Sequence, residues 1–219
     1  MKKRYLIICA LLLFINFCEG QTAFPAFAKD ILSFKHQDSI KTPPKNAILF
    51  VGSSSFARWT SMADDFPGYP IINRGFGGST LTDVIRYAYD VIIPYEPKQV
   101  LIYCGDNDLA ANVSVRDVVK RFKTLFQMIR TNLPETTIDF VSIKPSPLRQ
   151  QLIAKMKGVN AQVKAFLKNE KNAGFIDVYS AMLDAKGNVK EDLFVEDRLH
   201  LNEKGYAIWK KIILPYLNK

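Results

Sequence analysis

The chain has 219 residues, of which 48% are hydrophobic, and this fits one domain with a sizeable core. Its net charge of +9 comes from lysines and arginines spread over predicted helix surfaces, without a basic stripe interleaved with aromatic side chains. The sequence therefore predicts a solvated basic surface and no nucleic-acid partner.

The first twenty residues have the pattern of a secretory signal peptide. Residues 2–4 are basic, and residues 5–17 form an apolar run that is too short to span a bilayer comfortably. Residues 18–20 offer small side chains ahead of a cleavage site. We therefore exclude 1–20 from the fold and expect a secreted or periplasmic protein, with no stable membrane insertion after cleavage. Lipidation at Cys18 is the alternative, which the bulky residue before it disfavours.

Cleavage would leave Cys104 as the single cysteine, so no internal disulfide could form. Cys104 follows an apolar run, and we expect it to be a small buried hydrophobic side chain. Residues 21–44 are predicted as an N-terminal lead-in and residues 45–219 as the folded domain.

Five short, continuous apolar runs predict strands that are buried on both faces of a sheet. The runs are 47–51, 70–73, 99–104, 137–143 and 174–178. Helical patterns lie between them. This alternation predicts an α/β fold with three α/β/α layers, in which a flavodoxin-like, mostly parallel five-stranded sheet has helices on both faces.

Three longer segments have apolar residues at helical spacing. One covers 118–129 and is preceded by a capping box that begins at Ser114. The second covers 152–166. The third runs from 201 to 216 and closes the chain, with Asn202 as its expected N-cap.

Polar clusters follow four of the predicted strands. Gly52-Ser53-Ser54-Ser55 follows the first, residues 75–80 follow the second, and Gly105-Asp106-Asn107-Asp108 follows the third. Asp197-Arg198-Leu199-His200 comes about twenty residues after the fifth. Ligands bind beyond the carboxyl ends of strands in open parallel sheets, so we expect all four clusters at one edge.

The last cluster supplies a candidate catalytic base. The chain has two histidines, His36 and His200, and the carboxylate of Asp197 can reach back to the His200 imidazole and fix its tautomer. Such a base activates a serine hydroxyl, which Gly52 would expose at a helix N-terminus by allowing a tight turn. A surface turn and an ordinary serine-rich N-cap are the alternatives for these two clusters.

The remaining clusters supply candidate donors for an oxyanion. Gly77-Gly78 offers a backbone N–H that no side chain obstructs, and Asn107 offers a neutral amide donor. A tight strand–helix turn and an Asx turn are the respective alternatives. Residues 75–80 also fall near a dinucleotide-binding fingerprint, but Thr80 replaces its third glycine and no suitable acidic residue follows.

These motifs resemble the SGNH hydrolases, also called the GDSL-type esterase and lipase superfamily. The Gly-x-Asn-Asp and Asp-x-x-His motifs of that family match residues 105–108 and 197–200 in the right order, and residues 73–80 resemble its glycine block, which indicates Gly78. The resemblance runs from about Ile48 to the C-terminus. It is greatest to the branch of platelet-activating-factor acetylhydrolases and bacterial carbohydrate acetylesterases.

One position departs from the family pattern. The first family block reads Gly-Asp-Ser, whereas this chain has Gly52-Ser53-Ser54. Alignment puts Ser53 in place of the aspartate and Ser54 in place of the nucleophile, with Ser53 and Ser55 as alternative nucleophiles.

The resemblance implies a secreted serine esterase that hydrolyses short-chain esters of a small molecule or glycan, with acetyl as the expected acyl group. Ser54 would attack, His200 would act as base, and Asp197 would orient it. The Ser54 N–H, Gly78 and Asn107 would bind the oxyanion, with no cofactor and no metal. Two other readings stay open: a non-catalytic glycan-binding protein that keeps the pocket, and an acyltransferase that uses the same site.

Overall fold

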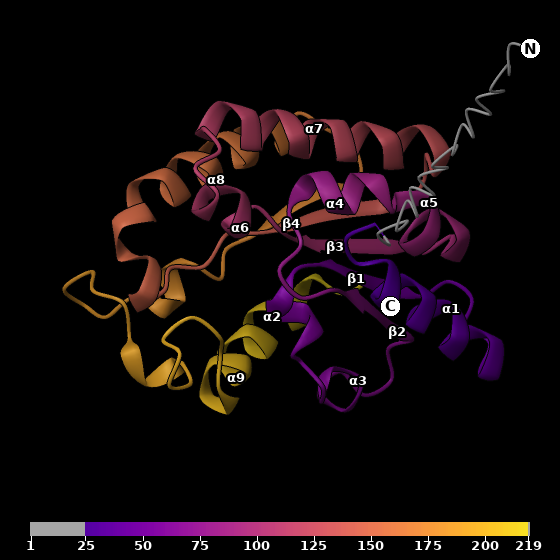
Figure 1. Cartoon of the computed structure of the whole chain (residues 1–219), viewed down its shortest axis with the longest axis horizontal. Helices are drawn as coiled ribbons and strands as arrows, with labels where there is room; N and C mark the ends of the chain where they lie inside the picture. Colours follow the sequence, from indigo (N-terminus) through magenta and orange to yellow (C-terminus); the bar gives the residue numbers. More distant parts are fainter. Residues whose placement is uncertain (1–24, 219) are drawn as a thin grey trace, which may run out of the picture.

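A computed structural model of the chain describes residues 25–218. The predicted signal peptide, 1–20, and the first residues of the lead-in lie outside this range. Five parallel strands form one sheet in the order β2-β1-β3-β4-β5 (Figure 1). The predicted α/β fold with a flavodoxin-like parallel sheet is confirmed.

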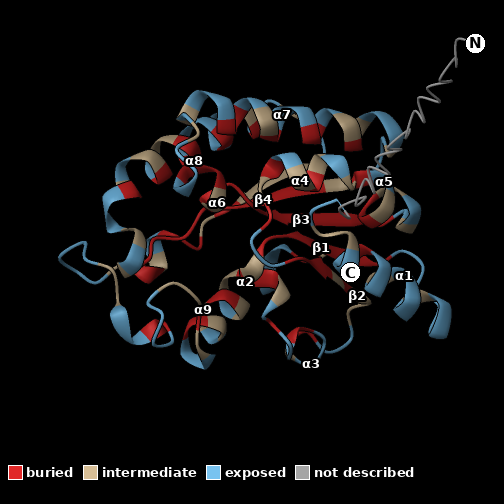
Figure 2. Ribbon diagram, viewed as in Figure 1, coloured by how far each residue is buried: buried red, intermediate tan, exposed pale blue. Residues whose placement is uncertain are grey.

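The strands match the predicted apolar runs within a few residues. They are β1 (Ile48–Gly52), β2 (Ile71–Gly75), β3 (Gln99–Tyr103), β4 (Thr137–Val141) and β5 (Ala173–Ile176). Every residue of β1 and β3 is buried, which explains why these strands read as continuous runs rather than as alternating patterns (Figure 2). The fifth strand begins and ends earlier than the predicted 174–178.

Helices cover both faces of the sheet, and the strand residues alternate between them. Leu49 and Val51 share one core with α4 (Leu81–Arg86), α5 (Ala88–Val91), α7 (Val115–Asn132) and α8 (Ile153–Leu167). Ile48 and Phe50 share the other core with α2 (Ser54–Ala57), α3 (Met62–Asp65) and α9 (Glu203–Ile213) (Figure 1). These are the three layers predicted from the sequence.

Short helices complete the described part of the chain. They are α1 (Ala28–Ile40), α6 (Asp106–Ala110), η1 (Ile93–Tyr95), η2 (Pro147–Leu152), η3 (Ser180–Met182), η4 (Glu191–Leu193) and η5 (Leu214–Tyr216). Within residues 25–218, none of the helices combines the length and the apolar composition that a bilayer crossing requires.

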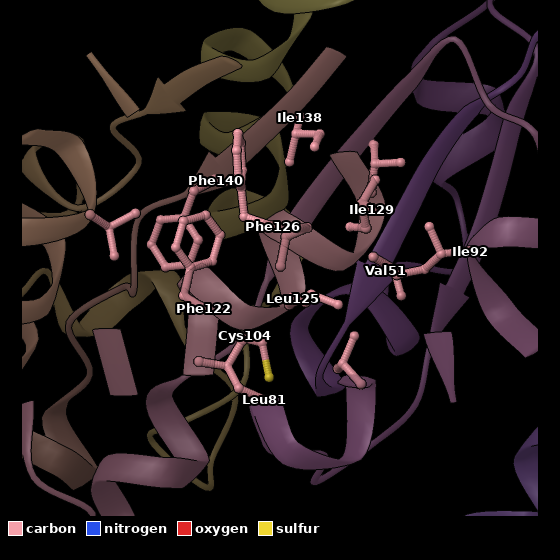
Figure 3. Packing of buried hydrophobic residues seen from close by; sticks show 14 of the residues in the cluster. Val51, Leu81, Ile92, Cys104, Phe122, Leu125, Phe126, Ile129, Ile138 and Phe140 are labelled. Atoms are coloured by element: carbon pink, nitrogen blue, oxygen red, sulfur yellow. The ribbon is translucent and has the colours of Figure 1, made fainter. Parts of the chain in front are cut away.

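The α7 helix carries the largest apolar stripe of the first core. Phe122 is fully buried, and its ring lies 4.8 Å from that of Phe140 on β4, with Phe126 and Phe166 also in contact (Figure 3). Ser114 is the N-cap of this helix, since its hydroxyl accepts a hydrogen bond from the Asp117 N–H at 3.1 Å. The predicted capping box is only half formed, because the Asp117 carboxylate accepts from the Ser114 hydroxyl rather than from the Ser114 N–H.

The C-terminal helix is shorter than the predicted 201–216. Asn202 is its N-cap, as expected, and accepts a hydrogen bond from the Gly205 N–H, so Leu201 lies outside it. Pro215 ends the α-helical hydrogen bonding, because proline has no N–H to donate, and the last turn becomes η5.

The predicted lead-in contains a helix that the sequence did not reveal. Ile31 is the buried hydrophobic residue of α1, so the segment lacks a wide apolar stripe. Phe34 also packs against the core. A polar contact adds to this: the buried Arg74 side chain of β2 pairs with Asp38 and donates to the Tyr95 hydroxyl at 2.7 Å. A charge pair of this kind leaves no periodic pattern in a sequence.

Truncation of Phe122 tests the role of the α7 stripe. Phe122→Ala should lower the free energy of unfolding by about 3–5 kcal/mol, because it removes a buried ring and leaves a cavity. Urea denaturation followed by circular dichroism measures this. Leu32→Ala, at a side chain that is 55% exposed, is the control and should change stability by less than about 0.5 kcal/mol. Equal effects of the two variants would contradict the packing described.

Candidate active site

The polar clusters meet at the carboxyl edge of the sheet. In the parallel register Gly52 lies opposite both Gly75 of β2 and Tyr103 of β3, so the segments that follow these strands leave the sheet side by side. The strand order reverses direction between β1 and β3, which is the topological switch point where such folds bind ligands.

Gly52 permits the turn that starts this site. Its φ angle is +133°, and a Cβ atom at this position would lie 2.0 Å from the Tyr103 carbonyl oxygen. The Ser53 N–H donates to the same oxygen at 2.9 Å. The chain therefore enters α2 at Ser54 while it stays hydrogen-bonded to the neighbouring strand.

The structure brings Ser54, His200 and Asp197 together. His200 Nε2 lies 3.0 Å from Ser54 Oγ, although 146 positions separate the two residues in the chain. His200 Nδ1 lies 2.6 Å from Asp197 Oδ2. The imidazole is thus held between a carboxylate and a serine hydroxyl. Because a carboxylate can only accept a hydrogen bond, Nδ1 carries the proton and Nε2 is the acceptor.

A tight loop positions the Asp197 carboxylate. Its Oδ1 accepts hydrogen bonds from the N–H groups of Leu199 and His200 at 2.9 and 2.8 Å. Arg198, between Asp197 and Leu199, adopts a positive φ of 57°. Burial works against the charged carboxylate, but the hydrogen bonds from the His200 side chain and the backbone outweigh it. The pKa of Asp197 is held well below its usual range.

Asn107 lies at the start of α6 and faces the serine loop. Its Nδ2 donates to Ser53 Oγ at 2.7 Å and to the Ser79 carbonyl oxygen at 3.1 Å. Gly78 precedes Ser79 in the same loop with a φ of +84°, and a Cβ atom there would meet nothing within 4 Å. The predicted oxyanion residues therefore come from loops that are hydrogen-bonded to each other.

A cluster of buried charges lies behind Asn107. Asp106 forms ion pairs with Arg149 of η2 and, at 3.6 Å, with Lys144, which follows β4. The Lys144 side chain is 1% exposed, and its ammonium group lies 5.9 Å from the centre of the Phe194 ring. Burial lowers the pKa of Lys144 to about 7, although the charge of Asp197 opposes the shift.

Arg149 joins this cluster to the site. Its Nη2 donates to Asn107 Oδ1 at 2.9 Å, and its side chain is 14% exposed. Burial also lowers the pKa of the Arg149 guanidinium from its usual value, with the nearby Tyr103 acting in the opposite direction.

Comparison with family models identifies the chain. Residues 44–208, about three quarters of it, match the model described as the GDSL-like Lipase/Acylhydrolase family. The chain belongs to this family. It is a hydrolase that acts on ester bonds, as the sequence motifs predicted. A comparison with curated proteins finds no match.

Solved structures share the fold of this chain. A structure from Streptococcus pneumoniae named for platelet activating factor is 23% identical, with a TM-score of 0.77 over 87% of this chain and 92% of that chain. An acylhydrolase from Bacteroides fragilis is 21% identical, with a TM-score of 0.72 over 84% and 94% of the two chains. An acetylxylan esterase from Geobacillus stearothermophilus is 16% identical, with a TM-score of 0.63 over 78% and 93%.

The GDSL-like domain also contains polar residues that sequence reasoning missed. Neither Lys144 nor Arg149 belongs to the four clusters that the sequence motifs indicate. Both cations follow β4, at the same edge of the sheet as the other clusters, and this position is the signal that could have identified them. By contrast, Trp59 is 1% exposed and packs in the second core.

The lowered pKa of Lys144 should make the free energy of unfolding depend on pH. The folded protein loses this proton near pH 7, whereas an unfolded chain holds it to about pH 10.4. Between these pH values the unfolded chain binds more protons, so the wild type should gain stability as pH rises, by at most about 1.4 kcal/mol per pH unit. Lys144→Met should lack this gain.

Urea unfolding of the wild type and Lys144→Met between pH 6 and pH 9.5 measures the difference. The free energy of unfolding of Lys144→Met should exceed that of the wild type by most near pH 6, and this difference should shrink above pH 7. Lys204→Met, at a side chain that is 70% exposed, is the control and should follow the wild-type pH dependence. Parallel pH profiles for the wild type and Lys144→Met would show that Lys144 stays charged in the fold.

Proposed function

We propose that this GDSL-like hydrolase is a secreted serine esterase that cleaves short acyl esters, with acetyl as the preferred group, by a Ser54–His200–Asp197 mechanism. The observation that carries the proposal is the 3.0 Å separation of His200 Nε2 and Ser54 Oγ, with Asp197 on the other imidazole nitrogen. Nucleophile and base are within proton-transfer distance, and the base is itself oriented.

The reaction has two halves. Ser54 Oγ attacks the ester carbonyl while His200 Nε2 takes the serine proton, and His200 then returns that proton to the departing alcohol. In the second half His200 deprotonates a water molecule that attacks the acyl-serine. The bond from the acyl carbon to Ser54 Oγ then breaks, His200 returns the proton to Ser54 Oγ, and the carboxylic acid leaves. Asp197 remains a carboxylate throughout and stabilises the imidazolium, in agreement with its lowered pKa.

Asn107 would stabilise the negative oxygen that forms in each half. One hydrogen of its Nδ2 is held by the Ser79 carbonyl, whereas the other points to Ser53 Oγ, the residue next to the nucleophile. To bind an oxyanion, this second hydrogen would exchange the Ser53 hydroxyl for the substrate oxygen. The Gly78 and Ser54 N–H groups are the further donors that we assign to this oxyanion hole.

Exposed apolar groups around the site are few, and this favours a water-soluble ester over bulk lipid. Of the exposed large hydrophobic residues in the described range, only Leu148 and Val195 belong to the segments that surround the site. An enzyme that binds a lipid surface needs a larger apolar patch. The similar fold of an acetylxylan esterase supports a glycan acetate as the substrate class.

A groove next to the His200 loop suits the alcohol half of such an ester. It has a volume of about 610 Å³ and runs between the end of α2 and the start of α9. Its walls are polar and aromatic, a composition that matches a sugar. They include Arg58, Trp59, Asn202, Glu203 and Tyr206.

Secretion rests on the sequence alone. The basic, apolar and small-residue segments of 1–20 support export, and the alternative is an anchored lipoprotein at Cys18.

Replacement of the nucleophile is the direct test of this mechanism. Ser54→Ala should reduce kcat for p-nitrophenyl acetate by at least about a thousandfold and abolish labelling by a fluorophosphonate probe, because it removes the hydroxyl that lies 3.0 Å from His200 Nε2. Ser55→Ala is the matched control on the next residue of α2 and should stay within about threefold of wild type.

The outcomes separate the three functions considered. A wild type that neither turns over short esters nor labels would be a binding protein rather than an esterase. Label that persists in Ser54→Ala would assign the nucleophile to Ser53 or Ser55. Acyl transfer to an added sugar in preference to water would make the protein a transferase.

The preference for short, soluble esters has its own test. Across p-nitrophenyl acetate, butyrate and octanoate, kcat/KM should be highest for acetate and fall by about tenfold or more towards octanoate, because the site offers little apolar surface to a long chain. A rise with chain length, or an activity jump when the substrate forms an emulsion, would contradict this expectation.

A further inference from the structure

We propose that Arg149 is a positioning residue that fixes and polarises the amide of Asn107 for oxyanion binding. This inference rests on the proposed function, since it concerns the oxyanion hole of that reaction. The contact that motivates it is the hydrogen bond from Arg149 Nη2 to Asn107 Oδ1, at 2.9 Å, between η2 and α6.

The orientation of the Asn107 amide is determined from both ends. A guanidinium can only donate, so the group that faces Arg149 has to be the amide oxygen. A backbone carbonyl can only accept, so the group that faces the Ser79 oxygen at 3.1 Å has to be the amide nitrogen. Ser53 could donate or accept and would tolerate either orientation. Arg149 is therefore one of two contacts that aim Nδ2 towards the nucleophile loop.

The way in which Arg149 uses its donors points to Asn107 as well. An arginine that serves only as an ionic partner commonly binds both oxygens of one carboxylate. Here Nη1 pairs with Asp106 Oδ1, while Nη2 goes to Asn107. The second carboxylate oxygen of Asp106 is left to Lys144 at 3.6 Å and the Tyr103 hydroxyl at 3.4 Å. The guanidinium thus bridges a buried carboxylate and the candidate oxyanion donor.

The charge of Arg149 favours an anion at Asn107. Arg149 pairs with Asp106, and Lys144 lies 3.6 Å from the second oxygen of that carboxylate. A positively charged group that donates to the amide oxygen draws electron density from the amide and strengthens its N–H as a donor. On the other side of the amide, Ser53 presents a neutral hydroxyl where the family pattern has an aspartate, so no opposing charge stands there.

A double-mutant cycle tests whether Arg149 acts through Asn107. The variants are Arg149→Met, Asn107→Ala and the combination, assayed with p-nitrophenyl acetate. Arg149→Met should lower kcat by about tenfold to a hundredfold and change KM by less than about threefold, because the amide matters chiefly to the transition state. In the Asn107→Ala background, Arg149→Met should lower kcat by less than about twofold.

Arg121→Met is the matched control. Arg121 pairs at 2.7 Å with Asp108, another buried aspartate of α6, rather than with Asn107. Its loss should lower stability while kcat stays within about twofold of wild type. Arg149→Lys, which keeps the charge but cannot bridge both partners, should recover part of the lost kcat if charge contributes.

A measurement without turnover separates this inference from the proposed function. In ¹⁵N–¹H spectra, the Asn107 side-chain amide signals, assigned by their loss in Asn107→Ala, should shift in Arg149→Met and stay in place in Arg121→Met. Unmoved amide signals, equal kcat losses in both Asn107 backgrounds, or an equal effect of Arg121→Met would overturn the role of Arg149. An inactive, unlabelled wild type with the expected amide shift would instead refute the esterase mechanism alone.

Discussion

The close approach of Gly52 to Tyr103 is the constraint on which the site depends. With no side chain at Gly52, the end of β1 lies against β3 and the Ser53 N–H reaches the Tyr103 oxygen at 2.9 Å. Any Cβ at this position would collide with that carbonyl, and the positive φ would strain the turn. The start of α2 would then move away from the Asn107 loop, and the Ser54 hydroxyl would lose its alignment with His200.

The short α6 helix shows how a motif of four residues organises several elements. Asp108 is fully buried, accepts the Leu81 N–H of α4 at 2.9 Å and pairs with Arg121 of α7. Asp106 faces the opposite way, towards the cations that follow β4. Asn107 lies between them and turns to the serine loop. The two aspartates anchor the helix, which leaves the neutral amide as the group that can meet a substrate.

Much of this arrangement follows from the sequence, because it depends on local patterns. Buried parallel strands read as continuous apolar runs, and polar clusters after strands meet at one edge by topology alone. The contacts that hold Arg149 and Asp38 could not be predicted in this way, since they join segments far apart in the chain through single charges. The exchange of a family aspartate for Ser53 was visible in the sequence, but only the structure gives that hydroxyl its contact with Asn107.

The geometry at Ser54 can be examined most directly in a crystal structure of the protein after reaction with a small fluorophosphonate, whose adduct resembles the tetrahedral intermediate. We expect a covalent bond from phosphorus to Ser54 Oγ, with the phosphoryl oxygen within hydrogen-bond distance of Asn107 Nδ2 and of the Gly78 and Ser54 N–H groups. An adduct on another serine, or a phosphoryl oxygen that points away from Asn107 and Gly78, would contradict the convergence of these loops on one reaction centre.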